Sequence, residues 1–203
     1  VRCVRIPRRW LSALLIVAAP PAVAAVVIGV RATTGTPPPP PDAFLAYPGA
    51  GAMTLPALMG IVVLNGFGEE AGWRGFALER LSPAFGPFAA TLVVATLWAV
   101  WHLPLFWLNQ SMAALAGPML VGWVVGLVLG AFALSWLYLA FDRSVLLLAV
   151  WHVGYNFSVA TPGTAGFVAA LVTSLVMVWG IWAAWRLLHP PYSKPLPTHN
   201  SGG

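Results

Sequence analysis

The sequence predicts an all-α fold: a polytopic transmembrane bundle of about six helices in a single membrane domain covering residues 1–203. Of all residues, 60% are hydrophobic and only 7% are charged, whereas ordinary soluble domains carry about 25% charged residues. The apolar residues form six runs, most of them near the roughly 20 residues that a membrane-spanning helix needs. Most Lys and Arg residues lie between these runs, where they act as topology signals. We therefore expect the lipid bilayer as a partner, and no nucleic acid despite the net charge of +5.

The six expected helices cover residues 11–30, 52–80, 84–108, 118–141, 145–160 and 165–188. The first run follows several arginines and contains Ala22-Val23-Ala24, so a cleaved signal peptide is one interpretation. Because the hydrophobicity continues through Val30, we favour a retained anchor. Residues 31–51 contain five consecutive prolines and are expected to form an extended linker, since proline lacks a backbone donor. Residues 190–203 are expected to be disordered.

The distribution of basic residues predicts the orientation. If the helices alternate in direction, all of the ten Lys and Arg residues except Arg31 fall on one side. Cytoplasmic segments are enriched in Lys and Arg, so both termini are expected in the cytoplasm. The compact size of the chain favours a bacterial cytoplasmic membrane. The single cysteine, Cys3, allows no internal disulfide, and nothing in the sequence predicts the oligomeric state.

Polar residues within the apolar runs are the candidates for function, because ionisable groups in a membrane are costly and usually face a cavity. Glu70 and Arg74 are four residues apart and share a helix face, so Arg74 is expected to neutralise Glu70. Glu69 lies about 100° around the axis and is expected to meet a different neighbour. An ordinary ion pair at a helix end, without chemistry at Glu69, is the alternative interpretation.

Two further motifs follow. Trp98 and His102 are one turn apart in the third run, where Pro104 is expected to kink the helix. His152 and Asn156 also share a face and can converge on one small group, although an interhelical hydrogen bond would explain the pair equally well. Ser158 lies on a different face from His152 and is therefore not expected to be a nucleophile.

Taken together, Glu69-Glu70-x-x-x-Arg74, Trp98 with His102, and His152 with Asn156 resemble the CAAX-protease and bacteriocin-processing family of intramembrane proteases, whose best-known members are type II CAAX prenyl endopeptidases. The family pattern is E-E-x-x-x-R, then F-x-x-x-H, then H-x-x-x-N or H-x-x-x-D. This chain departs from it at Trp98. The resemblance covers residues 52–160, which are therefore the expected catalytic core.

The resemblance implies an endopeptidase that cleaves membrane-associated or lipidated proteins with a water activated by glutamate. Glu69 and His102 would activate the water, while His152 and Asn156 would stabilise the oxyanion. Glu70 and Arg74 would be supporting residues. No cofactor is expected.

Two alternatives remain open. A zinc-dependent protease would use Glu69, His102 and His152 as ligands, although the chain lacks an H-E-x-x-H motif. A non-catalytic membrane scaffold or immunity protein of the same fold would need none of these side chains for chemistry.

Overall fold

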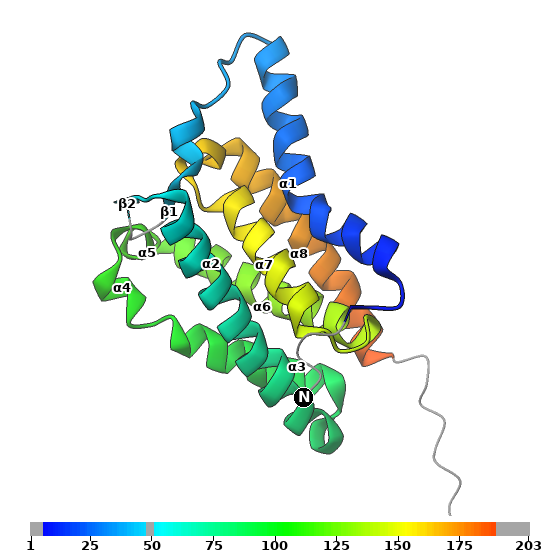
Figure 1. Ribbon diagram of the computed structural model, residues 1–203. Coiled ribbons are helices and arrows are strands. Elements are labelled where there is room, and N and C mark those ends of the chain that lie inside the picture. Colours follow the sequence, from blue (N-terminus) through cyan, green and yellow to red (C-terminus); the bar gives the residue numbers. More distant parts are fainter. Residues whose placement is uncertain (1–5, 48–50, 190–203) are drawn as a thin grey trace, which may run out of the picture.

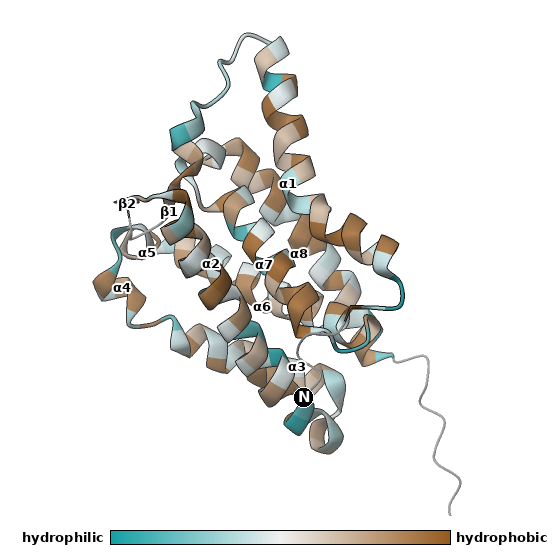
Figure 2. Ribbon diagram, viewed as in Figure 1, coloured by the Kyte–Doolittle hydropathy of each residue, from teal (hydrophilic) through white to brown (hydrophobic). Residues whose placement is uncertain are grey.

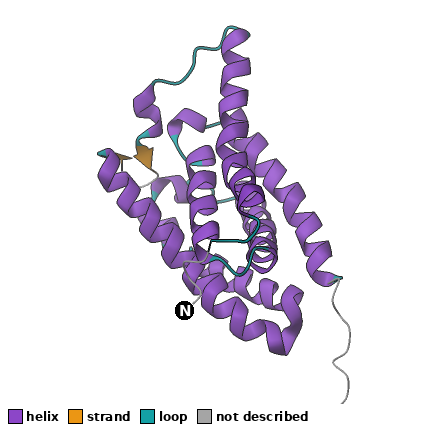
Figure 3. Ribbon diagram, turned by 45° about the vertical axis from the view of Figure 1, so that its right-hand side comes forward, coloured by secondary structure: helices purple, strands orange, loops and turns teal. Residues whose placement is uncertain are grey.

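The computed structural model describes residues 6–47 and 51–189. Helices dominate this part of the chain (Figure 1, Figure 3). In order, the elements are α1 (Trp10–Thr33), η1 (Pro41–Phe44), β1 (Ala46–Tyr47), β2 (Gly51–Ala52), α2 (Leu55–Glu70), η2 (Ala71–Leu78), α3 (Glu79–Trp101), α4 (Leu105–Leu108), α5 (Gln110–Ala113), α6 (Pro118–Ala140), α7 (Val145–Val159), η3 (Pro162–Thr164) and α8 (Phe167–Leu188). The elements η1 and η3 are 3₁₀-helices, η2 is a π-helix, and β1 and β2 form a small antiparallel pair.

The all-α membrane bundle expected from the sequence is confirmed. Within the described residues, four helical stretches are long and apolar enough to cross a bilayer: Trp10–Thr33, Leu55–Leu108, Pro118–Ala140 and Phe167–Leu188. The stretch Leu55–Leu108 contains two of the expected helices, and α7 is a shorter apolar helix of 15 residues. Six membrane spans therefore remain a prediction.

The boundary between the second and third expected helices differs from the prediction. The helical path that begins with α2 runs through η2 and past Arg80 without a break. It breaks at Gly86, whose φ of +75° is a conformation that other residues rarely adopt. Pro87 then starts the next helical segment, where its missing N–H costs nothing.

The expected linker between the first two helices is extended over residues 36–40 and then forms η1 and the β1–β2 pair. The segment also packs against the bundle, because a Cβ on Gly163 of η3 would lie 2.8 Å from the Phe44 ring. The predicted disorder of residues 190–203 concerns a part of the chain outside the described residues.

The bundle core lies between α3, α6, α7 and α8, and α1 packs against α7 and α8. Figure 2 shows mostly brown and white helices, with teal gathered on the loops and helix ends. One end of the bundle, which we call the basic end, joins the start of α1, the start of α3, the α6–α7 turn and the end of α8 (Figure 1). It carries Arg8, Arg9, Arg80, Arg143 and Arg186, against the acidic residues Glu79 and Asp142.

Candidate active site

The polar residues singled out from the sequence lie on four elements. Glu69 and Glu70 end α2, and Arg74 lies in η2. Trp98 lies in α3 and His102 follows it, while His152 and Asn156 lie within α7. Because α2 packs against α7, α3 against α6, and η2 against both α6 and α7, the three sequence motifs meet in one region of the bundle.

The helices α2 and α7 approach each other closely at Gly66, next to the polar residues. A Cβ on Gly66 would lie 2.8 Å from Val153 Cγ2 and 3.1 Å from the Ala149 carbonyl oxygen. Only glycine fits there without a shift of the neighbouring atoms. Glu70 is one turn further along α2, and His152 precedes Val153, so this contact controls the separation of the two polar residues.

Glu70 is the centre of a buried charge network. Its Oε1 accepts a hydrogen bond from Arg74 Nη1 at 3.0 Å and another from His152 Nδ1 at 2.8 Å. Glu70 and Arg74 are fully buried, and His152 is 8% exposed. The i, i+4 pairing expected from the sequence is therefore present, and it starts at the end of α2 and reaches into the π-helix η2. Glu70 thus holds two other side chains through Oε1, while its Oε2 is buried without a hydrogen-bond partner among the described residues.

Glu69 meets a different partner. The indole Nε1 of Trp98 donates a hydrogen bond to Glu69 Oε2 at 2.8 Å, joining α2 to α3. The Glu69 side chain is half-buried, whereas Trp98 is buried. The two adjacent carboxylates thus have separate environments, one buried within an ion network and one held by a neutral donor.

His102 lies where α3 ends. Its Nδ1 donates to the Trp98 carbonyl oxygen at 2.6 Å, and its ring contacts the Trp98 ring with centroids 5.7 Å apart. The helical path is interrupted just before Pro104: α3 stops at Trp101, a turn follows, and α4 begins at Leu105. His102 therefore lies at the end of α3, and the kink at Pro104 remains a prediction.

Trp98 contacts residues of all three sequence motifs. Besides its bonds to Glu69 and His102, its ring lies 4.6 Å below the Arg74 guanidinium and 5.8 Å from the His152 ring. The sequence identified Trp98 as lying one turn before His102 and as a departure from a family pattern. Its indole donor was missed because the partner is 29 residues away. We call Glu69, Glu70, Arg74, Trp98, His102 and His152 the Trp98 cluster.

Trp123 of α6 also belongs to the site wall and was missed from the sequence. Its ring contacts the His102 ring edge-on, with centroids 5.4 Å apart, and the Phe106 ring at 5.5 Å. As one of eleven tryptophans in an apolar chain, it has no sequence signal of its own. Asn156 lies one turn beyond His152 on the same face of α7 and is half-buried.

The hydrogen bonds leave specific chemistry available. A carbonyl or a carboxylate can only accept, so Nδ1 carries the proton in both His102 and His152. Each ring therefore has Nε2 left for another group. Glu69 retains a second carboxylate oxygen besides the one bonded to Trp98. The site thus combines a carboxylate, two oriented imidazoles and a nearby amide. Among the described residues, no three His, Cys, Asp or Glu side chains are grouped as a metal-binding set.

The fold and this cluster define a helical membrane protein with a group of ionisable side chains among its helices, and comparison with known proteins gives its family. The description "Type II CAAX prenyl endopeptidase Rce1-like" matches residues 51–158, a little more than half of the chain. The "CAAX prenyl protease 2" of Methanococcus maripaludis is 26% identical over 92 residues. That alignment covers 43% of this chain and 34% of the relative, so the match spans about a third of the relative's length.

The chain belongs to the Rce1-like family of type II CAAX prenyl endopeptidases. The matched residues 51–158 contain every member of the Trp98 cluster and Asn156, whereas α1 and α8 lie outside them. The resemblance inferred from the three motifs is therefore confirmed at the level of the family.

Proposed function

We propose that this protein is an intramembrane endopeptidase that hydrolyses a peptide bond of a membrane-associated protein. The observation that carries this proposal is the division of roles between the two adjacent carboxylates. Glu70 is fully buried and holds Arg74 and His152, whereas Glu69 is half-buried and held by one neutral donor. A carboxylate of the second kind is suited to take a proton from water.

In the proposed reaction, Glu69 and His102 bind a water molecule, and Glu69 takes one of its protons. The resulting hydroxide adds to the scissile carbonyl carbon and forms a tetrahedral oxyanion. His152 and Asn156 donate to this oxyanion, for which the His152 ring carries a proton on Nε2 as well as on Nδ1. When the C–N bond breaks, the proton held by Glu69 passes to the leaving amine, so that the carboxylate is restored.

The family and the relative's name support a lipidated substrate. The relative is called a CAAX prenyl protease, and we propose that this chain likewise accepts a protein with a lipid-modified C-terminal region. The positive-inside rule would place the basic end in the cytoplasm, and with it both termini. No cofactor is required by the proposed steps.

The test is cleavage of prenylated and unprenylated peptides by purified protein in detergent, followed by mass spectrometry. Glu69→Gln is the sharpest variant, because the amide oxygen still accepts from Trp98 Nε1 but no longer acts as a base. We expect kcat to fall by roughly 10²–10⁴-fold, the usual contribution of a general base. Glu79→Gln is the matched control, since Glu79 pairs with Arg143 at the basic end.

A scaffold of the same fold would give a different result. If the wild type cleaves neither peptide class, or if Glu69→Gln and His102→Ala cleave as fast as Glu79→Gln, the proposal is wrong. Repeating the assay with a chelator distinguishes the zinc alternative. The proposed steps predict the same cleavage rate in EDTA, whereas activity that is lost in EDTA and restored by Zn²⁺ would indicate a metal enzyme.

A further inference from the structure

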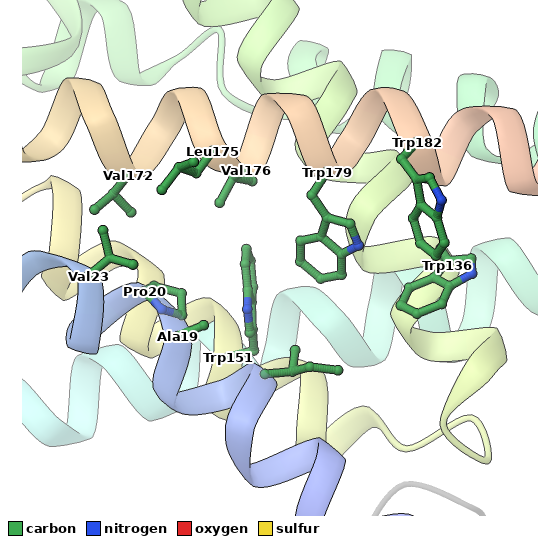
Figure 4. A pocket seen from close by; sticks show the side chains of 11 residues that line it. Ala19, Pro20, Val23, Trp136, Trp151, Val172, Leu175, Val176, Trp179 and Trp182 are labelled. Atoms are coloured by element: carbon green, nitrogen blue, oxygen red, sulfur yellow. The ribbon is translucent and has the colours of Figure 1, made fainter.

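An open cavity of about 400 Å³ lies on a different face of α7 from the Trp98 cluster. It is lined by α1, α7 and α8, with α6 at one end (Figure 4). Trp151 of α7 lines it, while the adjacent His152 faces Glu70. The cavity and the candidate active site therefore use different faces of one helix, and the following inference does not depend on the proposed proteolysis.

The shape of α1 creates this cavity. At one end of the cavity, Ala24 of α1 packs with Val168 and Val172 of α8. Pro20 and Pro21 lie within α1, and Figure 1 shows the helix changing direction along its length. The cavity lies between α1 and α8 beside this bend.

The lining determines what kind of group fits. Its side chains are aliphatic or tryptophan, with no charged or hydroxyl group among them. Trp136, Trp179 and Trp182 form one edge-to-face group, with Trp151 against Trp179 (Figure 4). Along α8 the lining runs from Val172 to Trp182, roughly 15 Å at 1.5 Å per residue. This is about half of a 30 Å hydrocarbon core, the depth of one leaflet.

Arg186, at the basic end, is placed to contact the headgroup of a lipid whose acyl chain lies in the cavity. Arg186 lies one turn beyond Trp182, with its guanidinium 5.7 Å from the Trp182 ring. Its Nε is buried and has no hydrogen-bond partner among the described residues. The surrounding end of the bundle has an excess of arginine over acidic residues, as described above. A chain in the cavity therefore ends beside an unsatisfied cationic donor, which suits an anionic headgroup.

We propose that the cavity binds one acyl chain of an anionic phospholipid, whose phosphate accepts from Arg186. The occupant is a lipid of the leaflet in contact with the basic end. It fills the space that the bend in α1 leaves beside α7 and thereby supports the face of α7 opposite the candidate active site.

Native mass spectrometry of delipidated protein tests this proposal. The protein is titrated with dioleoyl phosphatidylglycerol or dioleoyl phosphatidylcholine, and bound lipids are counted. Ala19→Phe fills the cavity, and Ala18→Phe is its matched control, because Ala18 is equally exposed on α1 but does not line the cavity. Arg186→Ala removes the proposed phosphate donor, with Arg80→Ala as the control from the basic end.

We expect the wild type, Ala18→Phe and Arg80→Ala to retain one phosphatidylglycerol molecule with a preference over phosphatidylcholine. Ala19→Phe should lose it, and Arg186→Ala should bind it about tenfold more weakly, as for a lost charge-assisted hydrogen bond. Equal binding by Ala19→Phe and Ala18→Phe would overturn the proposal. If a farnesylated cysteine displaces the bound phosphatidylglycerol, and excess phosphatidylglycerol does not displace the farnesylated cysteine in turn, the proposal would also be overturned in favour of an isoprenoid site.

Discussion

Replacing Arg74 with methionine is predicted to destabilise the protein strongly. Arg74 and Glu70 are both fully buried, and Arg74 Nη1 lies 3.0 Å from Glu70 Oε1. The variant would leave the Glu70 carboxylate without its guanidinium partner. Removing one member of a buried ion pair typically costs about 3–5 kcal/mol. For a domain of this length, that corresponds to a fall in Tm of roughly 6–20 °C.

The assay is thermal unfolding in one detergent, followed by tryptophan fluorescence, with Arg80→Met as the matched control. Arg80 is exposed and stacks on Phe76, so its loss should cost only about 0.5–1 kcal/mol. The double variant Glu70→Gln/Arg74→Met should be more stable than Arg74→Met, since it contains no buried carboxylate that lacks its guanidinium partner. If Arg74→Met melts within the range of Arg80→Met, the buried pair does not stabilise the fold as argued.

Three further changes have expected outcomes in the same preparation. Trp98→Phe keeps an aromatic ring but removes the indole N–H that donates to Glu69, so kcat/KM for peptide cleavage should fall about tenfold. An unchanged value would show that the indole N–H does not position the carboxylate. Asn156→Ala should lower kcat by roughly 10²–10³-fold with little change in KM, as for a lost oxyanion donor, and a selective rise in KM would contradict that role. Gly66→Ala should destabilise the bundle by about 1–3 kcal/mol in chemical unfolding, whereas Gly60→Ala, where an added Cβ meets nothing, should not; equal effects would exclude the close packing of α2 on α7 as the cause.

The sequence predicted the features that depend on local spacing. The apolar runs predicted the helices, and the four-residue spacing predicted the ion pair between Glu70 and Arg74. The shared position of His152 and Asn156 on α7 also follows from spacing alone. The catalytic roles of these residues remain predictions.

The features that failed or were missed depend on three-dimensional packing. The break in the helical path at Gly86 was expected a few residues earlier, because a glycine and a proline can end a helix at several neighbouring positions. The bond from Trp98 to Glu69 and the contact of Trp123 with His102 join separate helices and leave no periodic signal. The cavity beside α1 was missed for a related reason: side chains facing lipid and side chains facing a protein cavity are both apolar in sequence.

The glycine contact between α2 and α7 has a consequence for how this enzyme family can diversify. Because Gly66 brings the two backbones together one turn before Glu70, the separation of Glu70 and His152 is set by the main chain. By contrast, the wall opposite is made of replaceable rings on α6 and in the segment after α3, such as Trp123 and Phe106. Natural variation and directed evolution of substrate range should therefore accumulate on that wall, while the junction of α2 and α7 stays unchanged.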